Sequence, residues 1–544
     1  MGLALALSGT MGCAVNEGDL ARWETTMGGP RRLSAVVLHD KYPHALRVQA
    51  AMSLVRMKPR KGKNVGIERL VKGALVCDPE FLLPEEPCQK TQLSPEERAK
   101  ILADFVPLLI EELKKPPPEP AQGGQAAPDP SFMYKDAAFL LLTYEQAQIV
   151  ADAELRGQLE AALTDWALAD FENRLNDRTQ AYGMEQLLRH IGPKSVEGLP
   201  ALMTKDARSL DKMADIIAKI GDKPTREEAS KQLVKIATYV ASKEWREAKL
   251  PELKEANRAA GFDPNEKQLE KQMADYQDEA VTRIYASMKK VGGEAVVTYA
   301  LDVAADSKED AKRRQAALAA LEGHIDRKND DHIKKLLAIA KSDAPALVID
   351  QAFRRVRELP RERVASDLYA MFDTKDWKIR RLAAATILQM SEAKDIDEFL
   401  SELAKRADKN FNLPEAITYG AYLATLKGGK ILDKLEPHMK RGDAKARLAA
   451  ISYWYEKGTK NDLGAISSLE TDGQSVPTCA DEDQCDWSCL VPTTGDKKES
   501  KTVKTVGDFV SYCIKPKMQA SEPEKKDAEK GDQGSNEKKD EEKK

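Results

Sequence analysis

Seven cysteines are the residues of this chain whose spacing points most clearly to chemistry. Cys77 and Cys88 flank a Pro-rich segment whose ends can readily meet, and four more crowd the stretch 474–516. These four are Cys479, Cys485, Cys489 and Cys513. With Cys13 set aside an even number remains, and none lies between residues 89 and 478. That distribution predicts disulfides formed in an oxidising compartment.

The pairing follows from the same spacing. We expect Cys77 to bond to Cys88, and the last four cysteines to pair among themselves in one of three connectivities. The alternative is a zinc site, which requires Cys or His residues at ligand spacing. No histidine follows His438, and the cysteines do not show the C-x2-C spacing. Disulfides therefore account for the pattern better than a metal does.

Other residues that could do chemistry form weaker patterns. The acidic run 481–483 lacks the spacing of a calcium-binding EF-hand, and phosphate-binding and hydrolase motifs do not occur. The densest metal-like group lies in one stretch that also looks like a loop between two helices, where Asp and Asn act as caps. Its members are His324, Asp326, Asp330, Asp331 and His332. The sequence predicts no catalytic residue, no metal and no cofactor.

The composition favours helices. Of the 544 residues, 42% are hydrophobic and only 6% aromatic, which fits a helical protein better than a β-sandwich or barrel. The net charge is −4, with basic and acidic residues interspersed, so nothing indicates a nucleic-acid partner. No apolar run reaches the roughly 18 residues that a membrane span needs. We expect Trp377, Trp454 and Trp487 to be packing residues.

The first thirteen residues, MGLALALSGTMGC, hold a short apolar run, small residues and then Gly12 and Cys13. This segment resembles the end of a bacterial lipoprotein signal, in which the cysteine becomes lipidated and N-terminal. Thr10 departs from that pattern, and no Lys or Arg precedes the run, so we expect an earlier start codon. The resemblance implies a lipid on Cys13. Because Ala14 rather than Asp follows, it also implies the outer membrane.

The chain divides by composition into segments with different expected structures. Residues 115–131 are dominated by Pro and Gly and predict an extended linker or surface loop, and residues 517–544 are too charged to fold. The expected order is a signal end at 1–13, an N-terminal helical domain at 17–114, the linker at 115–131, helical repeats with a long-helix insertion at 132–305, a repeat array at 306–473, a small Cys-rich module at 474–516, and a disordered charged tail at 517–544.

The second half of the sequence repeats itself. Helix-opening motifs begin at Asp310, Asp376 and Asp443, and the alanine pairs that follow them start at Ala316, Ala383 and Ala449, which are 67 and 66 residues apart. Each interval holds two units of about 33 residues, each with a second amphipathic stretch. The pattern resembles HEAT-like repeats, of the type found in phycobilisome lyases. This resemblance implies an all-α solenoid of stacked antiparallel helix pairs.

The recurring residue types have a physical reading. One helix pair cannot cover its own apolar face, so neighbouring pairs must stack, and small alanines allow their close approach. The aspartates are expected to cap the first helices. Arg380 and Arg447 stand four residues after Asp376 and Asp443, where exposed ion pairs worth about 0.3–0.5 kcal/mol are expected.

Together these patterns predict a non-enzymatic scaffold that is lipid-anchored and binds protein partners along its repeats. The expected location is the bacterial cell envelope, at the periplasmic face of the outer membrane. The membrane is contacted through the lipid alone, and no nucleic acid is bound. Two alternatives remain open: a cytosolic HEAT-like adaptor with free thiols, and an envelope enzyme with a site between repeats.

Overall fold

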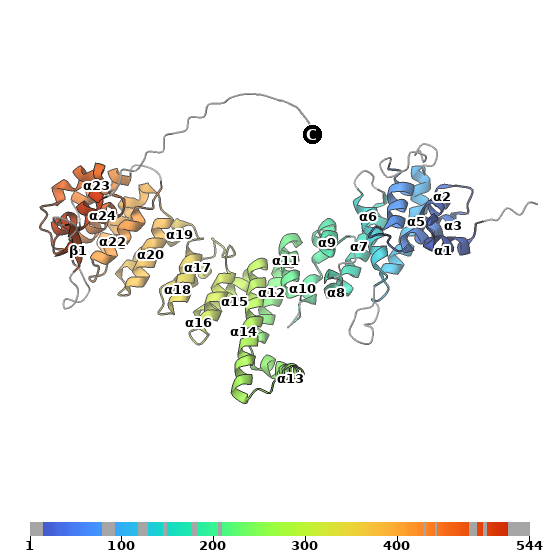
Figure 1. Ribbon diagram of the computed structural model, residues 1–544, viewed down its shortest axis with the longest axis horizontal. Helices are drawn as coiled ribbons and strands as arrows, with labels where there is room; N and C mark the ends of the chain where they lie inside the picture. Colours follow the sequence, from blue (N-terminus) through green and yellow to red (C-terminus); the bar gives the residue numbers. More distant parts are fainter. Residues whose placement is uncertain are drawn as a thin grey trace, which may run out of the picture. The chain divides into compact units, whose positions relative to one another are not determined.

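The computed structural model describes residues 15–78, 93–117, 129–144, 149–176, 182–204, 209–427, 431–440, 443–477, 487–492 and 498–520. Their contacts divide the chain into two compact units, Met1–Val296 and Val297–Lys544. Both units are mostly helical (Figure 1). Within these ranges, none of the helices combines the length and apolar character that crossing a membrane requires.

The first unit is built from helices of very different length. In chain order they are α1 (Glu17–Thr25), α2 (Gly29–Leu38), α3 (His44–Arg56), α4 (Val65–Glu68), the π-helical η1 (Arg69–Leu75), α5 (Pro95–Leu113), α6 (Phe132–Thr143), α7 (Ala153–Ala169), α8 (Phe171–Asn176), α9 (Met184–Ile191), η3 (Pro193–Val196), α10 (Leu199–Leu202), α11 (Leu210–Ile220), α12 (Lys223–Val240), α13 (Lys243–Ala259) and α14 (Glu266–Val291). Helix α15 (Glu294–Ala305) contains the boundary between the units.

A buried polar cluster holds part of this unit together. Lys135 of α6 is fully buried, and its ammonium lies 2.5 Å from the carboxylate of Asp136 and 2.5 Å from the carbonyl oxygen of Tyr182. Asp129, at the end of the predicted linker, lies 3.1 Å from the guanidinium of Arg174. The end of that segment is therefore packed against α8 rather than extended.

Helices α13 and α14 are long helices within the segment 132–305, where the sequence predicts a long-helix insertion. The side chain of Asn265 caps α14 by accepting a hydrogen bond from the backbone N–H of Gln268. The second half of α14 packs against α11 and α12, while its first half and α13 extend away from them (Figure 1). Trp245 is the one described residue of α13 that is fully buried.

The second unit consists of helix pairs of regular length, α16 to α24, followed by shorter helices and two strands. Its elements are α16 (Ala311–Ala320), α17 (Asp330–Ala340), α18 (Ala346–Val356), α19 (Arg361–Ala370), η4 (Met371–Asp373), α20 (Trp377–Gln389), η5 (Ala393–Asp395), α21 (Ile396–Arg406), α22 (Leu413–Leu423), α23 (Ile431–Lys440), α24 (Ala444–Lys457), η6 (Lys460–Asp462), α25 (Leu463–Ile466), η7 (Ser467–Leu469), β1 (Ser488–Pro492), β2 (Lys498–Thr502), α26 (Val506–Asp508), the π-helical η8 (Phe509–Ile514) and α27 (Lys515–Ala520).

These pairs stack as the repeat period predicts. The first helices α16, α18, α20, α22 and α24 contact one another in that order, and the second helices α19, α21 and α23 form a parallel row (Figure 1). All of the second amphipathic stretches expected from the sequence coincide with observed helices. The α-solenoid of antiparallel helix pairs is therefore confirmed.

Small residues permit the close stacking of first helices. Ala317, Ala383, Ala384 and Ala449 are fully buried. Helices α22 and α24 approach each other so closely that an added Cβ on Gly420 would lie 2.4 Å from the carbonyl carbon of Ser452. Van der Waals contact at that distance is impossible, so glycine is required there.

The C-terminal module is disulfide-bonded, as predicted, and adds a two-stranded ribbon to the otherwise helical fold. Strands β1 and β2 pair antiparallel, with Cys489 opposite Lys501. A disulfide of 2.00 Å joins Cys489 to Cys513 of η8. The four cysteines in a short stretch predicted disulfides in this module but gave no indication of a two-stranded ribbon.

This module covers the exposed end of the repeat stack. Phe509 is fully buried, and its ring centroid lies 5.9 Å from that of Tyr455 on α24. Met518 of α27 packs against Gly458, and the backbone N–H of Leu413 donates to the carbonyl of Pro477. Terminal repeats need such caps because their apolar faces have no further neighbour.

Candidate ligand pocket between two repeats

The three aspartates that open the repeat motifs cap their helices as predicted. Asp310, Asp376 and Asp443 each accept a hydrogen bond of 2.8 Å from the backbone N–H two residues further on. Such caps satisfy amides that have no partner in the first turn of a helix. The caps fix where each first helix begins and so position the residues that follow.

The arginine four residues later does not pair with this aspartate, so the predicted ion pairs are wrong. Each arginine instead donates to a backbone carbonyl just before its own helix. Nε of Arg314 lies 2.8 Å from the carbonyl oxygen of Ala304, and Nε of Arg447 lies 2.7 Å from that of Met439. Nη1 of Arg380 lies 2.6 Å from the carbonyl oxygen of Thr374.

The physical reason is that a helix end leaves carbonyl groups unsatisfied and carries partial negative charge, which attracts a cation. The cap aspartate is already occupied by backbone amides. An arginine at this position is buried rather than exposed: Arg314 and Arg380 retain 6% and 2% of their surface. Arg47 of the first unit repeats the contact, 2.9 Å from the carbonyl oxygen of Val37.

In two of the repeats an acidic residue closes the far side of the guanidinium. Arg380 donates to both carboxylate oxygens of Glu415 on α22, at 2.8 and 2.7 Å, and the hydroxyl of Tyr419 donates to the same carboxylate at 2.6 Å. Arg447 donates to Asp472 and to the side-chain oxygen of Gln474, the latter at 2.5 Å. Both arginines thus link consecutive layers of the stack.

The pKa values of Arg380 and Tyr419 reflect their contacts with the Glu415 carboxylate. Burial is the largest single effect and lowers the pKa of Arg380, but the hydrogen bonds to Glu415 and the charges of Glu415 and Asp408 act together to raise it overall. Burial also raises the pKa of the Tyr419 hydroxyl, and the neighbouring Glu415 carboxylate raises it further. The arginine is therefore held charged and the tyrosine neutral, as a structural ion pair requires.

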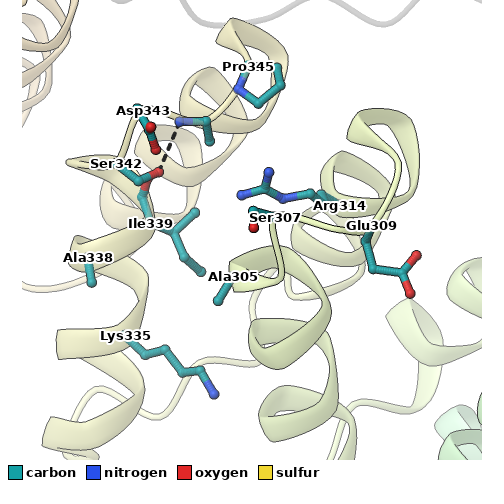
Figure 2. Close-up of a pocket in the computed structure, with 11 residues that line it drawn as sticks. Ala305, Ser307, Glu309, Arg314, Lys335, Ala338, Ile339, Ser342, Asp343 and Pro345 are labelled. Carbon is teal, nitrogen blue, oxygen red and sulfur yellow. Dashed lines mark hydrogen bonds between the residues drawn. The ribbon is translucent and has the colours of Figure 1, made fainter.

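Arg314 differs from the other two arginines because its far side is open. Within the described part of the chain, the one hydrogen bond of its side chain is the Nε contact with Ala304. The guanidinium instead lines a pocket of about 460 Å³ between α16 and the end of α17. Figure 2 shows this side chain extending toward Ile339 and Ser342, while Glu309 and Lys335 point away from it.

The remaining charged residues of this pocket mostly have partners. Glu309 lies 3.1 Å from Arg313, and Lys335 pairs with Asp302. Asp343 stands exposed at the rim. The other lining residues are small or apolar: Ala305, Ser307, Ala338, Ile339, Ser342, Ala344 and Pro345.

A second open site lies on α20 and α22. Trp377 is 49% exposed, which contradicts its predicted role as a packing residue, and Arg381 stacks over its ring at 5.0 Å. Both residues line a groove of about 370 Å³ together with Asn412, Pro414 and Thr418. By contrast, Trp454 is buried as predicted.

A third hollow, of about 940 Å³, separates α13 from the first half of α14. The apolar floor is formed by Leu250, Leu269 and Met273. Both basic and acidic side chains surround this floor. Because the surrounding charge is mixed, this groove favours no particular ligand.

Residues in and beside the densest metal-like group of the sequence make contacts within the chain. Asn329 caps α17, Asp330 pairs with Arg363, and the ring of His332 lies 3.2 Å from the hydroxyl of Thr298. Asp326 accepts from the backbone N–H of Lys328 in the loop between α16 and α17. Among the residues described, no group of three or more His, Cys, Asp or Glu could hold a metal ion.

The predicted cysteine sites are only partly within the described residues. Cys77 is disulfide-bonded, and Cys489 bonds to Cys513. Cys13, Cys88, Cys479 and Cys485 lie outside the described residues, so the Cys77–Cys88 pairing and the lipidation of Cys13 stay predictions. The sequence reading did not find Arg314 or Trp377 as site residues, although both belong to the repeat motif that it singled out.

Comparison with known proteins adds little to this picture. No protein-family model matches the chain, and no curated protein sequence matches it. One solved structure, that of Kap121p bound to Pho4p, aligns with 90% of this chain at 12% identity and a TM-score of 0.25. The alignment spans 59% of that protein's own length. The fold is therefore established by the helix contacts of this chain itself, which make it a helical-repeat protein.

Proposed function

We propose that this protein is a non-enzymatic scaffold that binds protein partners on its helical repeats. The observation that carries the proposal is the exposed Trp377, held by Arg381 beside an open groove on α20 and α22. Trp and Arg are the residue types that most often dominate protein–protein binding energy. A large apolar ring kept half in solvent lowers solubility unless another surface covers it.

The stacked arginine makes this aromatic surface rigid. Nε of Arg381 is buried and meets no hydrogen-bond acceptor within the described ranges, so the guanidinium is held chiefly by its ring contact. A preorganised Trp–Arg pair loses little side-chain entropy when a partner binds. Pro414, in the first turn of α22, adds a rigid apolar wall to the groove.

Site-specific photocrosslinking in cells tests this proposal. A photoreactive residue at position 377 is expected to capture a defined protein, and one at Lys405, exposed on α21 of the same repeat, is expected not to capture it. Replacing Arg381 by alanine should reduce capture at position 377 at least several-fold. Equal capture of the same proteins at 377 and 405 would contradict the proposed binding surface.

We also propose that the scaffold is anchored by a lipid on Cys13 in the bacterial cell envelope. The apolar run before Gly12 and the even number of other cysteines support this proposal. The Cys489–Cys513 disulfide supports it too, because such bonds persist in oxidising compartments. A triacylated N-terminus is what would make the anchoring stable, since one acyl chain binds membranes only marginally.

Metabolic labelling with an alkyne fatty acid measures the modification directly. The wild-type protein is expected to carry the label and to sediment with outer membranes. The Cys13→Ser variant should carry no label and should lose its membrane association. Equal labelling of the two proteins would contradict the proposed lipid anchor. It would not affect the proposal that partners bind at Trp377.

A further inference from the structure

Three equivalent arginines of the second unit provide an internal comparison. Arg314, Arg380 and Arg447 each follow a cap aspartate by four residues, and each binds a backbone carbonyl just before its own helix. Arg380 and Arg447 then receive a carboxylate from a later part of the chain. Arg314 receives no carboxylate within the described residues, although only 6% of its surface is exposed.

The missing carboxylate has a local cause in the following repeat. Glu415, which closes Arg380, is the third residue of α22. The third residue of α18 is Val348, which is fully buried and apolar. The first turn of α18 therefore offers no acid to Arg314, and the pocket of about 460 Å³ occupies the open side of its guanidinium.

We propose that this pocket binds one carboxylate of a peptide ligand, which pairs with Arg314 as Glu415 pairs with Arg380. Desolvating a guanidinium without a counter-charge is costly, and an incoming carboxylate relieves that cost with two parallel hydrogen bonds. The hydrogen bond from Nε of Arg314 to the carbonyl oxygen of Ala304 fixes the plane of the guanidinium before the ligand binds. Binding then requires little further ordering of the arginine.

The walls of the pocket favour a peptide side chain with a single charge. Ala305, Ala338, Ile339 and Pro345 offer apolar contacts to the methylene groups of Glu or Asp. The hydroxyl of Ser342 donates to the carbonyl oxygen of Ile339 at 2.7 Å and accepts from the backbone N–H of Ala344 at 3.3 Å. Its one hydrogen is therefore used within the chain, which leaves Arg314 to supply the charged donors of the pocket. The exposed carboxylate of Asp343 disfavours a phosphate, which carries nearly two negative charges.

The probe for this site is a fluorescein-labelled peptide that copies residues 413–419, because its glutamate already closes Arg380 in the folded chain. Fluorescence anisotropy with the full-length protein measures its affinity and that of a copy in which the glutamate is replaced by glutamine. We expect the glutamate peptide to bind at least ten-fold more tightly. Equal affinities of the two peptides for the wild-type protein would overturn the proposal.

Two variants assign this preference to the pocket. Arg314→Gln removes the charge, and Ala338→Trp fills the pocket from an exposed position of α17 without changing the arginine. Both are expected to abolish the preference for glutamate, while Lys334→Ala, an equal loss of charge on the exposed face of α17, should leave it unchanged. A preference that survives either pocket variant overturns the assignment, as does tighter binding of a phosphoserine copy of the peptide.

This inference does not depend on the proposed partner surface at Trp377. The peptide test can succeed while crosslinking at position 377 fails, and the reverse outcome is equally readable. The Ala338→Trp variant also keeps the test independent of folding, since thermal unfolding of a protein altered at an exposed alanine should match that of wild type.

Discussion

Arg380→Ala is expected to lower the free energy of unfolding of the second unit by about 3–5 kcal/mol, because it leaves a buried carboxylate without its counter-charge. The side chains of Arg380 and Glu415 retain 2% and 3% exposure, so water does not replace the lost partner. The lost carbonyl contact at Thr374 adds to the effect. Hydrogen exchange measured on peptides of α20 and α22 should show faster opening of both helices.

A second substitution separates the ion pair from simple packing. The double variant Arg380→Met with Glu415→Leu removes both charges and should recover most of the lost stability, since apolar replacements of buried pairs are often neutral. Lys405→Ala serves as the control, because its pair with Glu402 is 65% exposed on the lysine side and is expected to be worth under about 0.5 kcal/mol. A double variant no more stable than Arg380→Ala would show that Glu415 tolerates burial alone.

The repeat architecture could be predicted because it depends on periodicity that local sequence reveals. Cap aspartates, alanine pairs and second amphipathic stretches recur at one interval, and stacking is the one way such pairs can bury their faces. The first residues of α20 and α24 follow directly from the N-caps Asp376 and Asp443. The β1–β2 ribbon could not be predicted, because the residues 488–502 show no alternation of apolar and polar side chains.

The partners of the repeat arginines could not be predicted from spacing alone. A separation of four residues places Arg380 and Asp376 on one helix face, but the competing acceptors come from the preceding turn and from the next repeat. The exposure of Trp377 could not be predicted for a related reason. It stands directly after a cap, on the first-turn face of α20, where a large apolar residue is left half exposed.

The sequence does contain an indication that Arg314 lacks a carboxylate partner within the described residues, but it can be recognised only once the structure is known. Once Glu415 is known to close Arg380, the residue at the same place in α18 becomes informative, and it is Val348. Without the fold, the difference between a glutamate and a valine in two first turns carries no meaning. Sites of this kind arise from what one repeat lacks, so they are found by comparing repeats.

Gly420→Ala is expected to lower the free energy of unfolding by about 1–3 kcal/mol or more, because one methyl group must enter the close contact between α22 and α24. Its Cβ would lie 2.4 Å from the carbonyl carbon and 2.6 Å from the carbonyl oxygen of Ser452, and a backbone cannot move aside as a side chain can. Helices α22 and α24 would have to separate, which also strains the hydrogen bond between Leu413 and Pro477 of the C-terminal cap.

Gly464→Ala is the matched control, since that glycine lies at an exposed position of α25 with nothing within 4 Å of an added Cβ. The control should be neutral or slightly stabilising, because alanine is the better helix former. Thermal unfolding of the full chain compares the two, and equal melting temperatures would show that the α22–α24 contact does not limit stability.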